Sequence, residues 1–288
     1  MDHLVISILI SSCLFVIFKL FNVFKIHTLQ AITINYFVAF LIGFISSDLS
    51  LEVSQIPSQP WFFGALSLSV IFIIVFNLMA ATAQKNGLSV ASVANKMSVI
   101  IPVVFGVIVY NEAVGYLKVI GILLALVAVY LSASKSDSEP LKKKNLIFPL
   151  LLFIGSGVLD TTLKYVETRL VPDGGVPIFS ATIFIFASVL GCMLLMLQAS
   201  QGKFKFQFKN ILGGIALGIP NYYSIEFLLK ALKTEGFESS TVFTINNVSV
   251  VILTTLFGLL IFKEKLIKKN WAGIGIAIVS IFLVVLYG

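Results

Sequence analysis

Charged residues are scarce in this chain of 288 residues. Only 11% are Asp, Glu, Lys or Arg, whereas 58% are hydrophobic. Soluble domains carry about a quarter charged residues, so an ordinary soluble enzyme is excluded. The longest clearly polar stretch is the dozen residues from Ser134 to Asn145, which leaves no room for an extramembrane domain of about 50 residues or more. Nucleic-acid binding is excluded as well, despite the net charge of +7.

Cysteine and histidine are scarce too. Cys13 and Cys192 lie inside apolar runs, which excludes a disulfide framework or a zinc site, and we expect both to be buried as small apolar residues. His3 and His27 lie at the ends of such runs. The HExxH, GxSxG and P-loop motifs are missing, as is a paired Asp-rich motif, so no catalytic residue, metal ligand or cofactor is expected. An intramembrane enzyme is therefore the most remote of the function classes considered.

Long apolar runs are what the chain has in abundance. A membrane-spanning helix needs about 20 apolar residues, and ten such runs alternate with short polar breaks. The runs are apolar on all sides, unlike the alternating strands of a β-barrel, so we predict an all-α, multi-pass integral membrane protein. The expected helices cover residues 3–22, 29–47, 61–83, 89–110, 115–133, 146–165, 177–199, 210–232, 240–262 and 270–287.

The chain also repeats itself. Six residues recur 152 positions later, namely Asn95, Phe105, Gly106, Glu112, Gly121 and Ala125 as Asn247, Phe257, Gly258, Glu264, Gly273 and Ala277. Further matches are Gly64 with Gly213 and Gly87 with Gly236 at a spacing of 149, and Lys19 with Lys164 at a spacing of 145. We predict two five-helix repeats, residues 1–134 and 145–288, joined by a linker at 135–144. Five is odd, so the second repeat enters the membrane inverted, as in inverted-repeat transporters.

Two segments resemble the end of a known domain. The stretch from Pro102 to Glu112, followed by a helix containing Gly121, resembles the end of the EamA domain of the drug/metabolite transporter superfamily. The stretch from Phe257 through Glu264 to Gly273 resembles its second copy, although Leu253 or Thr254 replaces Pro102 there. The resemblance covers nearly the whole chain. It implies a ten-helix exporter or exchanger of small metabolites in the bacterial plasma membrane, without naming the substrate.

Basic residues are distributed unequally between the two sides. The loops after the odd-numbered expected helices hold 13 lysines, and the loops on the other side hold 3 basic residues. Because basic loops stay in the cytoplasm, this count places both termini outside the cytoplasm, whereas the family resemblance implies termini inside. The basic face suits either contact with anionic lipid head groups or attraction of anionic solutes.

Ionisable side chains inside the expected helices are candidates for a transport site. Each costs about 2.5–3.5 kcal/mol at the membrane centre, so it should face the bundle interior or a water-filled cavity. Asp160 and Lys164 are four residues apart, as are Glu226 and Lys230, so each pair either neutralises itself or takes part in transport. Asp160 and Glu226 are the candidates for proton coupling. Lys96 has no acidic residue three or four positions away and needs a counter-ion from elsewhere.

Uncharged polar residues complete the expected site. The candidate substrate-binding residues are Asn35, Asn77, Lys96, Asn221, Tyr222, Glu226, Lys230 and Asn247. Pro220 removes a helical hydrogen bond beside Asn221 and can expose backbone to a cavity. The Gly214-x-x-x-Gly218 pattern is assigned to helix packing. Glu264 lies at an expected membrane edge, where a structural cap or an interface contact is favoured over chemistry.

These observations favour a secondary active transporter. The expected substrate is a small polar metabolite, zwitterionic or anionic, carried by alternating access around a central cavity with proton coupling as an option. The alternative is a flippase for a lipid or lipid-linked carrier, which would need a lateral opening between helices. Expected partners are the metabolite and membrane lipids, with the chain as monomer or homodimer.

Overall fold

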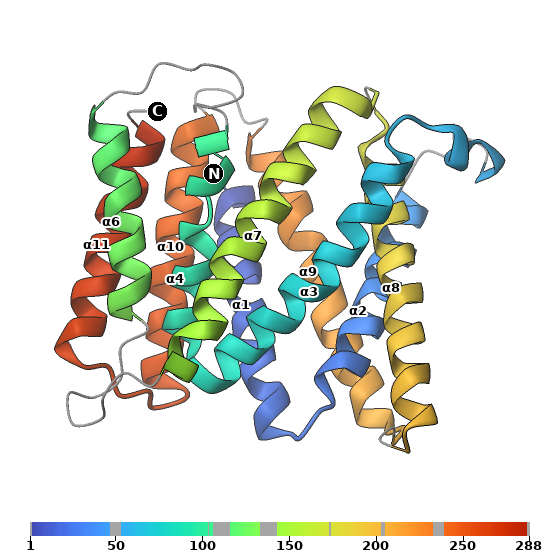
Figure 1. Cartoon of the computed structure of the whole chain (residues 1–288), viewed down its shortest axis with the longest axis horizontal. Coiled ribbons are helices and arrows are strands. Elements are labelled where there is room, and N and C mark those ends of the chain that lie inside the picture. Colours follow the sequence, from blue (N-terminus) through green and yellow to red (C-terminus); the bar gives the residue numbers. More distant parts are fainter. Residues whose placement is uncertain are drawn as a thin grey trace. The chain divides into compact units, whose positions relative to one another are not determined.

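The computed structural model describes residues 2–46, 53–102, 104–105, 116–132, 143–172, 174–202, 205–232 and 239–286 (Figure 1). Regular structure within these ranges is entirely helical. The α-helices are α1 (Asp2–Val23), α2 (Thr28–Ser46), α3 (Phe62–Asn86), α4 (Leu88–Met97), α6 (Tyr116–Ser132), α7 (Lys143–Leu170), α8 (Val176–Ser200), α9 (Phe208–Leu232), α10 (Ser239–Leu260) and α11 (Lys268–Leu286). Each expected segment therefore contains a helix. A short 3-10 helix, η1 (Val53–Ser58), was not predicted, and Gly106, Glu112 and residues 135–142 of the linker lie outside the described ranges.

Five of these helices are long and apolar enough to cross a membrane. They are α1, α2, α3, the Leu146–Glu167 part of α7, and α8. Large apolar side chains lie on the outside of the helices, for example Phe63 on α3, Leu123 on α6 and Met196 on α8, which are 74%, 58% and 69% exposed. A water-exposed surface of this kind would be unfavourable, whereas a lipid-facing one is not, so the helices have the character of a membrane protein.

The chain forms two compact units. Unit 1 comprises Met1–Leu20, Leu78–Val158 and Tyr223–Gly288, and unit 2 comprises Phe21–Asn77 and Leu159–Tyr222. Each unit contains segments from both halves of the sequence, and α1, α3, α7 and α9 contribute residues to both units. The units are thus a different division of the chain from the expected repeats at 1–134 and 145–288, whose boundaries remain a prediction.

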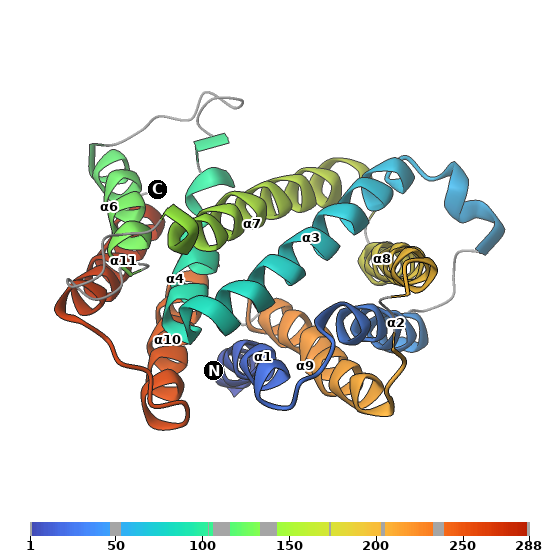
Figure 2. The ribbon, with the colours of Figure 1, turned by 60° about the horizontal axis from the view of Figure 1, so that its bottom comes forward.

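In unit 1, α6 and α11 lie side by side and run antiparallel (Figures 1 and 2). At one end of their contact the Ser280 hydroxyl donates a hydrogen bond of 2.7 Å to the carbonyl oxygen of Gly121. Nearer the other end, Gly273 packs against the backbone of Ala128. Ala125 and Ala277 between these points have no exposed surface, so small residues allow the two helices to approach closely.

A further pair within unit 1 is α4 with α10, also antiparallel. Thr254 on α10 donates a hydrogen bond of 2.7 Å to Ser92 on α4. Leu88, at the start of α4, contacts Glu264 beyond the end of α10. Several of the polar groups discussed below lie on this pair.

In unit 2, α2 and α8 form an antiparallel pair. Gly191 on α8 faces the Thr33 side chain, and Gly43 on α2 faces Ala181. Ser188 adds a hydrogen bond of 3.3 Å to the carbonyl oxygen of Thr33.

Tyr36 on α2 forms the aromatic centre of unit 2. It is fully buried among Phe72, Phe76 and Phe184. Its hydroxyl group donates a hydrogen bond of 2.8 Å to the carbonyl oxygen of Phe72. A buried tyrosine hydroxyl needs a hydrogen-bond partner, and the carbonyl oxygen of Phe72 provides it within this aromatic core.

The Gly214-x-x-x-Gly218 pattern is a packing motif, as predicted. A Cβ atom at Gly214 would lie 2.7 Å from the carbonyl oxygen of Ala31, and one at Gly218 would lie 2.8 Å from that of Asn35. Both contacts are with the backbone of α2, so α2 and α9 pack in parallel at a distance that only glycine permits.

The cysteines correct one expectation from the sequence. Cys13 and Cys192 were expected to be buried, but both side chains are exposed on their helices. An apolar run does not distinguish the face that packs against other helices from the face that meets lipid, because both are apolar.

Candidate functional site

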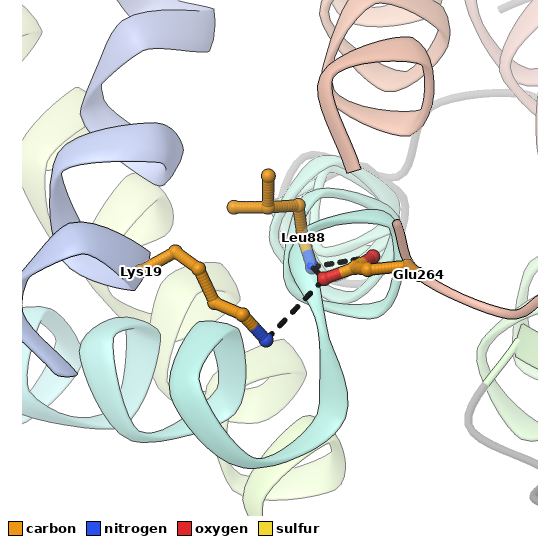
Figure 3. Close-up of polar contacts among 3 residues, drawn as sticks. All are labelled: Lys19, Leu88 and Glu264. Atoms are coloured by element: carbon orange, nitrogen blue, oxygen red, sulfur yellow. Dashed lines mark hydrogen bonds and ion pairs between the residues drawn. The ribbon is translucent and has the colours of Figure 1, made fainter. Parts of the chain in front are cut away.

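The carboxylate of Glu264 contacts two other segments of unit 1, at Leu88 and at Lys19 (Figure 3). Its Oε1 and Oε2 atoms accept hydrogen bonds of 2.9 and 3.2 Å from the backbone N–H of Leu88. The Lys19 ammonium group on α1 lies 3.4 Å from Oε1. We call Lys19, Leu88 and Glu264 the Glu264 clasp. It joins α1, the first turn of α4 and the segment after α10. Of the two structural roles left open by the sequence, a cap or an interface contact, the hydrogen bonds to Leu88 show a cap.

The backbone on both sides of the clasp is shaped to receive the carboxylate. Lys263 has a φ of 51°, a left-handed conformation that is uncommon for a non-glycine residue and turns the chain after α10. The backbone N–H of Glu264 then donates a hydrogen bond of 2.9 Å to the carbonyl oxygen of Gly258. Gly87, immediately before α4, has a φ of 107°. A Cβ atom at Gly87 would lie 2.9 Å from both carboxylate oxygens, and one at Gly258 would lie 2.6 Å from Oε2.

The charges of the clasp are largely removed from solvent. The side chains of Lys19 and Glu264 are 19% and 12% exposed. The carboxylate also meets the positive end of the α4 dipole, which favours a negative charge at a helix N-terminus. Lys19 therefore pairs with an acidic residue far away in the sequence.

Polar residues continue from the clasp along α4. Ser92 bonds to Thr254 on α10, and Asn95 donates a hydrogen bond of 2.9 Å to Ser156 on α7. Lys96 follows Asn95 on this helix and is partly exposed. Asn247, a predicted site residue on α10, is 7% exposed, and its neighbour Asn246 is 1% exposed with a side-chain oxygen that no described group satisfies.

Glu226 and Lys230 on α9 pair with each other. The Lys230 ammonium group lies 2.6 Å from Glu226 Oε1, and the side chains are 30% exposed for Glu226 and 48% for Lys230. The structure thus shows the intrahelical ion pair that the spacing of four residues predicts, and a part of the pair in transport stays a prediction. Lys230 also lies 5.4 Å from the ring centroid of Phe227, which adds a cation–π contact. Asp160 and Lys164, the corresponding pair on α7, are both exposed.

Asn35 on α2 is a buried polar side chain of unit 2 whose hydrogen-bonding groups are not used by the described residues. It has no exposed surface, and neither its amide nitrogen nor its amide oxygen has a hydrogen-bond partner among the described residues. Leaving such a group unpaired costs about 1–3 kcal/mol, so a buried orphan amide points to a missing partner. Asn35 is thus the predicted candidate whose surroundings most need a ligand or a water molecule.

The other candidate residues of unit 2 offer fewer hydrogen-bonding atoms to a ligand than Asn35 does. Asn77 on α3 donates a hydrogen bond of 2.8 Å to the carbonyl oxygen of Ile73 in its own helix. Asn221 is 3% exposed, and Tyr222 packs against Gly43 on α2. The helix α9 continues through Pro220.

The candidates thus divide between the two units. Unit 1 contains Lys96, Glu226, Lys230 and Asn247, and unit 2 contains Asn35, Asn77, Asp160, Asn221 and Tyr222. Among the described residues no group of three His, Cys, Asp or Glu side chains could hold a metal ion. The chemistry that these side chains offer is hydrogen bonding by amides and hydroxyls together with charge pairing by lysines.

A buried polar cluster at the start of α2 and α9 was missed by sequence reasoning. Asn210 accepts a hydrogen bond of 2.9 Å from the His27 backbone and donates one of 2.6 Å to the Gln30 side chain. Gln30 in turn donates one of 3.0 Å to the carbonyl oxygen of Lys205. Gln30 and Asn210 are 5% and 1% exposed. The signal available in the sequence was a polar residue in the first turn of each of two apolar helices.

Comparisons with known proteins extend over nearly the whole chain. No protein-family model matches it. A protein of Haemophilus influenzae, described as uncharacterized, is 27% identical over 291 residues, which cover 98% of this chain and 97% of that protein. A protein of known crystal structure, described only as a protein, matches with a TM-score of 0.58 at 13% identity over 98% of each chain. This second likeness concerns the fold alone.

Proposed function

We propose that this protein is a secondary active transporter built from two inverted five-helix repeats that span the membrane ten times. It exports or exchanges a small polar metabolite, zwitterionic or anionic, by alternating access. The resemblance of both repeat ends to the EamA domain agrees with this proposal. The main observation behind it is that helices at equivalent positions of the two expected repeats pack against each other in antiparallel pairs.

The first such pair is α6 with α11. At the repeat spacing of 152, Gly121 corresponds to Gly273 and Ala128 corresponds to Ser280. Replacing each residue by its equivalent in the other half turns the contact between Gly121 and Ser280 into the contact between Gly273 and Ala128. Both contacts are present. A contact that maps onto itself when the partners are exchanged is what a two-fold axis produces.

The second pair is α2 with α8, in the other unit. A spacing of 148 relates Gly43 to Gly191 and Thr33 to Ala181, and this value lies between the spacings of 145 and 149 that relate the flanking helices. The contact between Gly43 and Ala181 then corresponds to the contact between Gly191 and Thr33. In each of the two helix pairs, a contact is thus preserved when every residue is replaced by its equivalent in the other half of the chain.

The direction of the helices supports inversion in particular. Repeat-equivalent helices run antiparallel in both pairs, which requires a two-fold axis perpendicular to them. For membrane-spanning helices that axis lies in the membrane plane, and repeats related in this way have inverted topology. A transporter can then exchange its inward-open and outward-open states by exchanging the conformations of its two repeats.

Side chains of both units support the proposed solute class. Lys96 carries a positive charge on the polar face of α4, and Asn35 and Asn247 offer buried amides. Lys96 is the cation that we propose for contact with a carboxylate or phosphate group of the solute. We keep Asp160 and Glu226 as candidates for proton coupling.

Solute flux into proteoliposomes tests this proposal. The purified protein is reconstituted and offered labelled alanine, glutamate, succinate and phosphate, with and without a pH gradient. We expect exchange of at least one of these probes, lowered in Lys96→Met and unchanged in Lys265→Met, which removes an exposed lysine. Absence of flux for every probe in both conditions would contradict the proposed function.

A further inference from the structure

We propose that the Glu264 clasp is a switchable latch, which keeps one end of unit 1 closed in this state and releases α1 from the seam between α4 and α10 in another. This inference rests on the proposed transport function, because only a protein that changes state needs a latch. It concerns Lys19, Leu88 and Glu264, none of which is among the candidate solute-binding residues.

The first argument is that α4 takes its cap from a distant residue. A helix start is ordinarily capped by a Ser, Thr, Asp or Asn immediately before it. Here that position is Gly87, which has no side chain to cap the helix. The acceptor for the Leu88 N–H is instead Glu264, 176 residues away. A local cap would satisfy the helix equally well, whereas a distant cap makes the start of α4 depend on where the end of α10 lies.

The second argument is that the space for the carboxylate is made by two glycines. Any side chain at Gly87 or Gly258 would place a Cβ atom within 3.0 Å of the carboxylate oxygens. Glu264 therefore fits only when α4 and α10 have the spacing observed here. The clasp is specific for one arrangement of these helices and does not adapt to another.

The third argument concerns the charges. The ion pair between Lys19 and Glu264 is 3.4 Å long, with both side chains largely hidden from solvent. Such a pair is strong while the site is dry and weak once water enters, because the attraction between charges falls as the local dielectric constant rises. An opening that admits water hydrates both charges, so this contact can be broken reversibly.

Accessibility of a buried cysteine tests the latch without any solute. The reporter is Ser89→Cys, next to Leu88 and 1% exposed in the parent chain, in a background that carries Cys13→Ala and Cys192→Ala. Its rate of reaction with a water-soluble maleimide is measured in proteoliposomes for the parent, Glu264→Gln, Lys19→Met and the matched control Lys265→Met. Glu264→Gln removes the charge, and Lys19→Met removes the ion pair but leaves the hydrogen bonds to Leu88.

We expect Glu264→Gln and Lys19→Met to react about tenfold faster than the parent, which corresponds to about 1.4 kcal/mol in the opening equilibrium. Lys265→Met should react at the parental rate. A second reporter, Ser280→Cys, is fully buried between α6 and α11 and should keep its parental rate in all variants. Faster reaction at both reporters would mean general loosening and would overturn the latch.

An unchanged rate at Ser89→Cys in both clasp variants would also overturn it. If Glu264→Gln does not yield folded protein, Lys19→Met decides alone, since the cap of α4 stays intact. Labelling needs no substrate, so it can support the latch even if no solute flux is found. It can also contradict the latch even if flux is found. The two proposals therefore fail separately.

Discussion

Two glycines on α11 provide a matched test of how closely this helix packs against α6. A Cβ atom added at Gly273 would lie 2.6 Å from both the backbone nitrogen and the hydroxyl oxygen of Ser132, and 3.0 Å from the carbonyl oxygen of Ala128. A Cβ atom at Gly275, two residues further along, would meet nothing within 4 Å. The substitutions Gly273→Ala and Gly275→Ala therefore differ in one respect, the space around the new methyl group.

The expected magnitudes follow from two known effects. Replacing glycine by alanine inside a helix stabilises it by about 0.5–1 kcal/mol, and this gain is common to both variants. Overpacking a tight contact costs about 1–3 kcal/mol, and this cost falls on Gly273→Ala alone, because backbone atoms cannot move aside as a flexible side chain can. The difference in stability between the two variants should therefore be about 1–3 kcal/mol, with Gly275→Ala at or above the parent.

Equilibrium unfolding of the purified protein in mixed micelles, followed by tryptophan fluorescence, measures this difference. The parent, Gly273→Ala and Gly275→Ala are unfolded under the same conditions, and their free energies of unfolding are compared. Equal stability of the two variants would refute the close approach of α6 and α11, and with it one of the two helix pairs that support the inverted repeat.

Three further outcomes are expected. Thr254→Val removes the hydrogen bond to Ser92 and should lower the free energy of unfolding by about 0.5–1.5 kcal/mol, measured by the same unfolding experiment. A double-mutant cycle of Glu226→Gln and Lys230→Met should give a coupling energy of about 0.3–0.5 kcal/mol, as for other exposed pairs four residues apart, and a value near zero would contradict the 2.6 Å ion pair. If both termini lie outside the cytoplasm, as the distribution of lysines indicates, a cysteine at Ser136 should resist an impermeant thiol reagent added to intact cells, and strong labelling would reverse that orientation.

The helices themselves were predictable because their signal is local. A run of about 20 apolar residues bounded by turn residues identifies a membrane helix whatever it packs against. Packing through Gly214 and Gly218 was predictable for a similar reason, since small residues four positions apart form one smooth helix face. For Glu264 the sequence favoured a structural role, a cap or an interface contact, over chemistry, because the residue lies just beyond an apolar run.

Partners distant in the sequence were not predictable in the same way. Nothing near Glu264 indicates that it caps α4 or pairs with Lys19, and the cluster of His27, Gln30 and Asn210 likewise joins segments 180 residues apart. The exposed positions of Cys13 and Cys192 illustrate a second limit. Where the helix surface is apolar on every side, hydrophobicity does not tell the packed face from the lipid face, and burial must come from the structure.

The two-fold relation between the halves of the chain is tested most directly by the side of the membrane on which equivalent positions lie. Leu117 near the start of α6 and Lys269 near the start of α11 are 152 residues apart and hence equivalent. Each is replaced by cysteine in the Cys13→Ala, Cys192→Ala background and labelled with an impermeant reagent, from one side and then from both. Inverted repeats predict that the two cysteines react from opposite sides, and reaction of both from the same side would contradict the inversion.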